Sequence, residues 1–180
     1  MHVLIAYASR HGSTAGIAER IAVRLSEAGM TADLRPVSEV EDLDAYDAFV
    51  IGSAAYMLHW LKDATTFVKR HRDVLAARPL WLFSSGPLGP EALDANGEDA
   101  RESTRPQEFD ELTLLLHPRG EQVFFGAWDP DAPPVGMAER LMQLAPAAAR
   151  AFPAGDFRDW ADIDGWATQI ARELAVPARS

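Results

Sequence analysis

The sequence predicts an α/β fold in which a doubly wound, five-stranded parallel sheet carries helices on both faces. Three observations support this prediction: five short apolar runs, helical patterns between them, and no hairpin signal joining successive runs. Strands arranged in this way are connected by right-handed crossovers. The 180 residues, 48% of them hydrophobic, suffice for one such fold, so residues 1–180 are expected to form a single domain.

The first half of the chain contains three predicted strands and two predicted helices. Residues 2–8 form a nearly continuous apolar run, which is typical of a parallel strand covered on both faces. Ile17, Ile21 and Leu25 recur at helical spacing, and this predicts a helix over residues 14–28 that ends at Gly29. Further patterns predict strands at residues 31–36 and 49–51, the second ending at Gly52-Ser53, and a crossover helix over residues 60–77.

The second half of the chain contains two more strands and two more helices. Residues 80–83 predict a buried strand, and the polar residues 88–106 predict a long loop before a helix that carries Phe109 and Leu112. Residues 122–127 form the fifth apolar run. Residues 128–157 are expected to be an irregular insertion before the last helix, whose inner face carries Ile163, Trp166, Ile170 and Leu174.

Composition excludes several classes of function. The chain has no cysteine, so redox chemistry would have to come from a bound cofactor. A formal net charge of −10 disfavours nucleic acids and anionic membranes as partners. No apolar stretch approaches the roughly 20 residues of a membrane span, and the N-terminus lacks a signal-peptide pattern. We expect a cytoplasmic protein with no transmembrane segment and, from the histidine spacing, no metal; the oligomeric state is not predicted.

The turn after the first predicted strand is the natural phosphate site of such a sheet. It reads Ser9-Arg10-His11-Gly12-Ser13-Thr14. Its hydroxyls can donate to phosphate oxygens, Gly12 permits close approach of the backbone, and the amides that start the next helix point at an anion. The spacing fits neither the Walker motif nor the dinucleotide fingerprint. Taken alone, these residues could equally serve only to turn the chain and cap the helix.

Two further strands end in loops of small and polar residues, at residues 52–56 and 84–88. Three such loops at one edge of the sheet favour a binding site. The phosphate loop, with the pattern Ser-x-x-Gly-x-Thr, resembles that of the flavodoxin family, and the whole chain is most similar to the branch related to menaquinone-dependent protoporphyrinogen oxidase. This resemblance depends on Gly52-Ser53-Ala54-Ala55-Tyr56-Met57-Leu58-His59-Trp60-Leu61-Lys62, Phe83-Ser84-Ser85-Gly86-Pro87 and Gly155-Asp156-Phe157-Arg158-Asp159-Trp160.

The resemblance implies strand order 2-1-3-4-5 and non-covalently bound FMN. It assigns cofactor binding to three groups of residues: Ser9, Arg10, His11, Gly12, Ser13 and Thr14; Ala54, Ala55, Tyr56 and Met57; and Ser84, Ser85, Gly86, Pro87, Leu88 and Gly89. His11 stands where typical flavodoxins carry a small hydroxyl residue. Arg10 or His11 could compensate electrostatically, or either could point into solvent.

Several side chains near the expected flavin can be interpreted individually. Tyr56 is expected to contact the isoalloxazine ring, because an aromatic face suits a flat heterocycle. Amides of Ser85, Gly86 and Leu88 could donate to the pyrimidine edge of the flavin. Trp60 is expected to begin the crossover helix and pack on the sheet.

Other polar and aromatic residues have structural interpretations. His59 is expected to be a surface or capping residue, and no residue is assigned a catalytic role. Trp160, at helical spacing with the residues of the last helix, is expected in the core. Asp156, Arg158 and Asp159 predict an ion-pair and capping cluster.

Three functional hypotheses follow. The first is an FMN oxidoreductase that passes electrons from an organic substrate to a quinone-like acceptor. Met137, Leu141, Leu144 and Ala148 would then either line a site for a flat apolar molecule or simply cover the sheet. The related family has a basic insertion, whereas this one has Asp129, Asp131 and Glu139 against Arg140 and Arg150, and this departure argues against a porphyrinogen substrate. The second is an electron carrier that docks redox proteins through its acidic surface. The third is a domain that has lost its cofactor and binds only other proteins.

Overall fold

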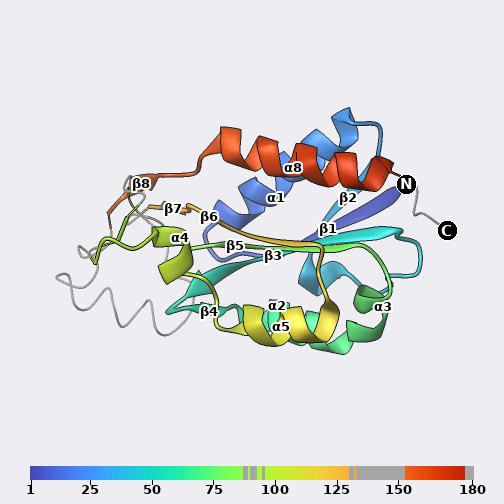
Figure 1. Cartoon of the computed structure of the whole chain (residues 1–180), viewed down its shortest axis with the longest axis horizontal. Helices are drawn as coiled ribbons and strands as arrows, with labels where there is room; N and C mark the ends of the chain where they lie inside the picture. The colour runs from blue at the N-terminus through green and yellow to red at the C-terminus, as the bar shows by residue number, and fades with distance from the viewer. Residues whose placement is uncertain (87–88, 90–92, 95, 130–131, 133–152, 177–180) are drawn as a thin grey trace.

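A parallel β-sheet forms the centre of the computed structural model, with helices on both of its faces (Figure 1). The structure describes residues 1–86, 89, 93–94, 96–129, 132 and 153–176. Five parallel strands lie in the order β2-β1-β3-β5-β6. Their bounds are β1 (His2–Ala8), β2 (Thr31–Pro36), β3 (Ala48–Tyr56), β5 (Leu80–Ser85) and β6 (Gly120–Phe124). Counted along the chain, these five strands have the predicted order 2-1-3-4-5, which confirms the predicted fold.

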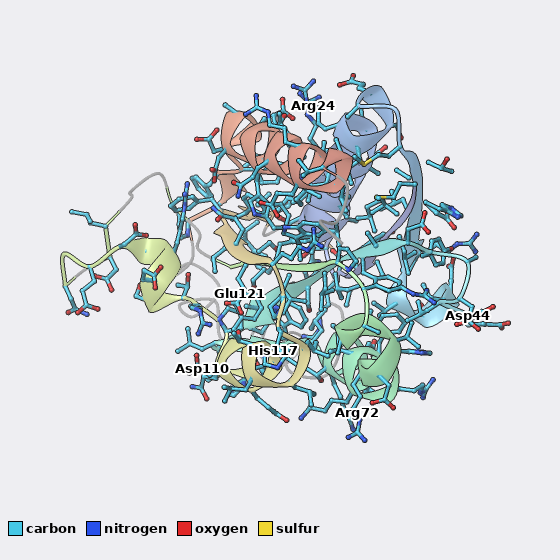
Figure 2. The ribbon with its side chains drawn as sticks, turned by 45° about the vertical axis from the view of Figure 1, so that its right-hand side comes forward. Arg24, Asp44, Arg72, Asp110, His117 and Glu121 are labelled. Atoms are coloured by element: carbon cyan, nitrogen blue, oxygen red, sulfur yellow. The ribbon has the colours of Figure 1, made fainter. Side chains whose placement is uncertain are left out.

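The helices form two layers (Figure 1). One face of the sheet carries α1 (Ser13–Glu27) and α8 (Trp160–Ala175), and the other carries α2 (Lys62–Arg70), α3 (Arg72–Ala76) and α5 (Glu108–Leu116). Charged side chains decorate the outside of both layers, with Arg24 on one and Arg72 on the other (Figure 2). Within the described residues, no helix combines the length and the apolar character that a membrane span needs.

Alternation along the strands divides the core into two clusters, because successive side chains of a strand point to opposite faces. Val3 and Ile5 of β1 face α1 and α8, where Ile17, Ile21, Leu25, Ile163, Ile170 and Leu174 are buried. Leu4 and Ala6 face the other layer, together with Phe109 and Leu112 of α5. The predicted inner faces of the first and last helices are therefore confirmed.

The third strand is longer than predicted, and a hairpin follows it. β3 continues past Gly52-Ser53 to Tyr56 because Ala54 pairs with Ser85 of β5 and Ala55 pairs with Trp60 of β4 (His59–Trp60). The five predicted strands are all parallel, as expected, and β4 is an additional short strand that the sequence did not predict. The turn is Met57-Leu58, and neither residue is the Gly or Asn that normally marks such a turn.

Three other boundaries differ from the predictions. Trp60 lies in β4, and the expected helix over residues 60–77 is two helices, because His71 between them has non-helical backbone angles. The fifth strand ends at Phe124 because its partner β5 ends at Ser85, opposite that residue. Residues 88–106, expected to form only a loop, include the short helix α4 (Ala100–Ser103), which Asp99 caps.

The remaining short elements are η1 (Val37–Glu39), β7 (Ala127–Trp128) and β8 (Gly155–Asp156). β7 and β8 pair antiparallel, so they join the two ends of the predicted insertion. Most of that insertion, including Met137, Leu141, Leu144 and Ala148, lies outside the described residues. Trp160 is 38% exposed rather than in the core, because it lies in the first turn of α8 with the Arg158 guanidinium over its ring.

Candidate functional site

The register of the sheet brings the ends of three strands to one edge. Ser53 of β3 lies between Ala8 of β1 and Ser84 of β5 in one row of paired residues. The Ser84 hydroxyl donates to the Ser53 carbonyl at 3.4 Å. The predicted convergence of the loops after β1, β3 and β5 follows from this parallel pairing. Figure 1 shows α4, β4, β7 and β8 at the same end of the sheet.

Helix α1 begins at this edge without a side-chain cap. Gly12 is its N-cap residue and has φ +82°, a left-handed conformation that favours glycine. Gly12 has no side chain that could cap the helix, and no acidic residue lies in the first turn of α1. These amides have no partner within the helix, and the helix dipole places partial positive charge there. The start of α1 therefore suits an anion such as a phosphate group.

The hydroxyls of the loop are held in place by hydrogen bonds from backbone amides. Ser9 Oγ accepts from Gly12 N at 3.1 Å, and Ser13 Oγ accepts from Ala127 N at 2.9 Å. A hydroxyl that accepts in this way keeps its own hydrogen to donate. Ser9 and Ser13 are thus held in a fixed orientation, and each hydroxyl can donate its hydrogen to a phosphate oxygen.

Thr14, unlike Ser9 and Ser13, pairs its hydroxyl with another side chain. It is fully buried, and its Oγ1 lies 2.7 Å from Ser85 Oγ, either of which could be the donor. This bond links the first turn of α1 to the end of β5. The side chain of Thr14 therefore joins two of the three loops, while its backbone amide remains one of the uncapped donors of α1.

The two basic residues of the loop contact aromatic rings on other segments. The Arg10 guanidinium lies over the Tyr56 ring, 4.7 Å from its centroid, and the His11 ring meets the Trp128 ring edge-on at 5.4 Å. Tyr56, expected beside the flavin, is thus in contact with the phosphate loop. Arg10 brings positive charge to the edge of an otherwise acidic chain.

The β3–β4 hairpin carries Ala54, Ala55, Tyr56 and Met57 to the same edge. Met57 and Leu58 have φ of 50° and 65°, which costs a non-glycine residue roughly 1–2 kcal/mol. The Met57 side chain is 93% exposed. α5 anchors the hairpin, because Gln107 N donates to the Leu58 carbonyl at 2.9 Å. A strained, exposed turn on an anchored hairpin is typical of functional sites.

Glu108 holds the base of this hairpin. One of its oxygens lies 2.9 Å from His59 Nδ1, and the other accepts from Trp60 N at 3.1 Å. Burial alone would raise the pKa of Glu108, but these hydrogen bonds outweigh it and place the pKa below its ordinary range. His59 is exposed, as expected, and the buried Trp60 packs edge-on against Phe109 at 5.2 Å.

The loop after β5 is only partly described. Ser84 and Ser85 are buried, and Gly89 has φ +121°. Gly86 N donates to the Phe124 carbonyl at 3.2 Å, so this amide is occupied within the sheet. The proposed donation of Gly86 N to the flavin would therefore have to compete with this bond. Pro87 and Leu88 lie outside the described residues.

Two segments at the site were missed by reasoning from sequence. β7 contacts the phosphate loop through Ala127 and Trp128, as described above. Arg158 pairs with Asp156 at 2.5 Å and lies against the start of α1, where a Cβ on Gly16 would come within 2.5 Å of its Nη1. The predicted cluster of Asp156, Arg158 and Asp159 exists, since Asp159 caps α8. Nothing in the sequence pattern placed β7 beside residue 13.

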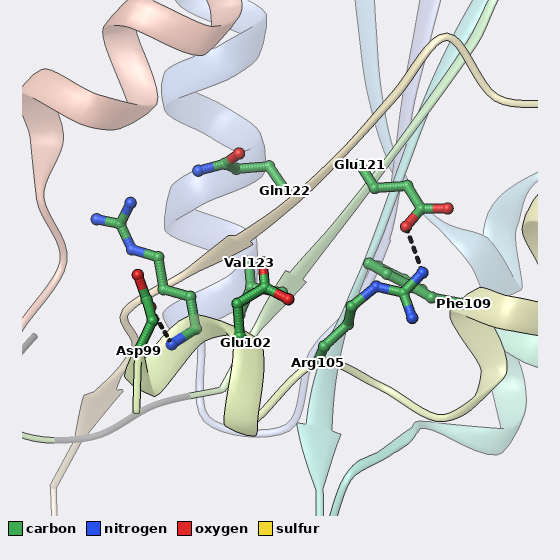
Figure 3. A pocket seen from close by; sticks show the side chains of 8 residues that line it. Asp99, Glu102, Arg105, Phe109, Glu121, Gln122 and Val123 are labelled. Carbon is green, nitrogen blue, oxygen red and sulfur yellow. Dashed lines mark hydrogen bonds and ion pairs between the residues drawn. The ribbon is translucent and has the colours of Figure 1, made fainter. Parts of the chain in front are cut away.

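A pocket of about 350 Å³ lies between α4, α5 and β6, apart from the three loops (Figure 3). Within it, Arg105 bonds to Glu121 at 2.8 Å, and it also bonds to Asp110 at 2.7 Å. Phe109 and Val123 contribute apolar surface. Arg105 is thus held by two carboxylates, and Arg101 pairs with Asp162 outside the pocket, so the three-loop edge remains the stronger candidate site. No group of three or more metal-ligating side chains occurs in the described part of the chain.

Comparisons with known proteins agree with this geometry. The family model of the flavodoxin domain matches residues 4–142. A protoporphyrinogen IX dehydrogenase [quinone] of Escherichia coli strain K12 is 34% identical over 86 residues. That match covers 47% of this chain and 48% of the relative, so the chain aligns with about half of the relative's length.

Solved structures share the fold at low sequence identity. A mutant flavodoxin from Pseudomonas aeruginosa has a TM-score of 0.61 and 19% identity, over 98% of this chain and all of that one. A flavodoxin from the domain Archaea has a TM-score of 0.60 and 13% identity, with the same coverage. The rubredoxin oxygen:oxidoreductase of Desulfovibrio gigas has a TM-score of 0.58 and 14% identity, over 97% of this chain but 37% of that one.

Proposed function

Because the chain belongs to the flavodoxin domain family, we propose that it is an FMN-dependent oxidoreductase that passes electrons from an organic substrate to a quinone-like acceptor. FMN is the cofactor of this family and of this chain. When bound, it supplies reversible transfer of electrons and protons, while the protein supplies position, charge and access.

The single observation that supports this function most strongly is the start of α1 at the three-loop edge. Ser9 and Ser13 would donate to the phosphate with the uncapped amides of α1. Ala54, Ala55, Tyr56 and Met57, with Ser84 and Ser85, would flank the ring. Gly12 would let the backbone approach the phosphate, Arg10 would add positive charge, and His11 would border the site.

The quinone-like acceptor is proposed from the similarity to the E. coli relative, whose name includes a quinone. The exposed Met57 at the hairpin tip supports an apolar reactant, since a polarizable thioether packs well on a flat ring. We also propose that residues 1–180 form one domain, and that the insertion at about 128–157 borders the substrate region. β7 and β8 bring both ends of that insertion to the cofactor edge.

A second candidate is an electron carrier that serves protein partners. The formal net charge of −10 favours it, because a strongly charged surface steers complementary partners. Such a carrier would exchange single electrons with redox proteins, whereas the proposed oxidoreductase would transfer two electrons and two protons to reduce a quinone to a quinol.

An anaerobic reoxidation experiment separates the two candidates. The purified protein is first titrated with FMN, and uptake is followed by visible absorbance. The loaded, chemically reduced protein is then mixed with menadione or with a cytochrome. We expect menadione to restore the oxidised flavin spectrum within the time of one catalytic turnover, with one quinol formed per reduced flavin. Rapid reoxidation by the cytochrome without reaction with menadione would contradict the proposal and favour the carrier.

A further inference from the structure

The indole N–H of Trp128 is buried and has no hydrogen-bond partner within the described part of the chain. Buried donors without an acceptor are rare in folded proteins, because each one has lost its bond to water without replacement. Indole Nε1 is a donor only, so the group that satisfies it must be an acceptor. An unpaired donor of this kind next to a binding site indicates a ligand atom.

Trp128 stands beside the phosphate loop. Its ring meets the His11 ring edge-on at 5.4 Å, and the preceding residue, Ala127, donates its N–H to Ser13 Oγ at 2.9 Å. Trp128 also pairs with Gly155 of β8, and Phe157 N donates to the Gly126 carbonyl at 3.0 Å. The first two contacts hold β7 against the start of α1, and the other two attach it to β8 and the residue that follows.

We propose that Trp128 binds FMN by donating its Nε1 hydrogen to the phosphate group. A phosphate monoester offers several charged acceptor oxygens, and a hydrogen bond to a charged group is stronger than one between neutral groups. The donor adds no charge of its own, and it supplements the hydroxyls of Ser9 and Ser13 and the uncapped amides of α1. β7 thereby forms a fourth wall of the phosphate site, contributed by a segment outside the three loops.

A second tryptophan provides a matched comparison. Trp60 Nε1 is also buried without a partner among the described residues. However, Trp60 lies in β4, where its ring packs on Phe109 and its backbone N donates to Glu108. Neither of these two contacts involves the phosphate loop. Loss of the same N–H at Trp60 should therefore leave phosphate recognition unchanged.

The test compares FMN with riboflavin, which has the same ring but no phosphate. Trp128→Phe keeps an aromatic ring and removes the N–H. We expect its Kd for FMN to rise about tenfold or more while its Kd for riboflavin stays within about twofold of wild type. Trp60→Phe is expected to leave the ratio of the two Kd values unchanged. Fluorescence titration measures both ligands, and the thermal midpoint of the apoprotein checks that each variant folds.

If Trp128 has a purely structural role, Trp128→Phe should weaken the binding of FMN and of riboflavin equally. That result would overturn the proposal, and so would an unchanged Kd for both ligands. Trp128→His keeps a ring N–H and is expected to retain more preference for FMN over riboflavin than Trp128→Phe. If the Phe variant does not fold, Trp128→His and Trp128→Leu provide the same comparison, since histidine keeps a ring N–H and leucine has no side-chain donor. The inference rests on FMN as the cofactor and on no particular substrate. A protein that binds FMN but does not reduce quinones would therefore contradict the proposed function and not the role of Trp128.

Discussion

Helices α1 and α8 cover the same face of the sheet but begin in opposite ways. Asp159 caps α8, and its carboxylate accepts from the amides of Ala161 and Asp162 at 3.0 and 3.1 Å. α1 begins at Gly12 in a left-handed conformation with no side-chain cap. Both helices bury similar apolar faces in one cluster. The difference shows that α8 gains stability at its first turn, whereas α1 leaves its first amides available for an anion.

The two helices are also joined to each other. Arg20 of α1 donates two hydrogen bonds to Asp164 of α8, both at 2.6 Å. Asp159 caps α8 itself, whereas Asp164 of α8 binds the neighbouring helix α1 through Arg20. The orientation of the uncapped end of α1 therefore depends on the capped helix beside it.

The largest expected effect comes from closing the open end of α1. Ser13→Asp places a carboxylate in the first helical turn, where the helix dipole stabilises it by about 0.3–1 kcal/mol. The same charge would repel the FMN phosphate, so we expect the Kd for FMN to rise about 100-fold or more. Urea unfolding of the apoprotein and FMN titration measure the two effects. Ser13→Asn, of the same size and neutral, is the control; equal FMN affinity of the Asp and wild-type proteins would contradict the anion site.

The next effect concerns the bond between α1 and the sheet. Thr14→Val keeps the shape of the side chain but leaves the buried Ser85 hydroxyl without a partner, so the free energy of unfolding should fall by about 1–3 kcal/mol. Ser85→Ala added to Thr14→Val should recover part of this loss, because no unpaired hydroxyl then remains. Urea unfolding of both variants measures this, and a double variant less stable than Thr14→Val would show that the pair is not coupled as described.

Removing the cap of α8 tests the other side of the comparison. Asp159→Ala should lower the free energy of unfolding by about 1 kcal/mol, the usual value of an N-cap. The Kd for FMN should stay close to wild type, because Asp159 does not belong to the phosphate loop. Asp159→Asn, which can still accept from the amides, should keep most of the stability. A strong loss of FMN binding in Asp159→Ala would mean that the two helix starts are not separate in function.

The smallest expected effect is a dependence of stability on pH at the link between the helices. The hydrogen bonds from Arg20 hold the pKa of Asp164 below its ordinary value of 3.8. Because the folded pKa is lowered, the stabilisation is present above the unfolded pKa and is lost as the pH falls through the folded pKa. Asp164→Asn should thus be less stable than wild type near neutral pH, and the gap should shrink below about pH 4. Thermal unfolding across this range measures it, and a constant gap would assign the effect to packing.

Local pattern was enough to predict what depends on neighbours in sequence. Apolar periodicity identified the inner faces of α1 and α8, because a helix presents residues three and four apart on one side. The alternation of predicted strands and helices without hairpin signals predicted parallel pairing, and that pairing brings the three loops to one edge. The residues proposed to hold the phosphate follow from this edge together with the Ser-x-x-Gly-x-Thr pattern and the family resemblance it supports.

The sequence by itself determined the fold class, the strand order through its family resemblance, and the position of the phosphate loop. The tertiary structure decided the features that depend on distant partners. Thr14 meets Ser85, 71 residues away, and β7 meets both β8 and the start of α1. The Met57-Leu58 turn exists because α5 anchors the hairpin, although its residues do not favour positive φ. Such contacts leave no periodic signal, because their energy comes from pairing between segments and not from the conformational preference of either one.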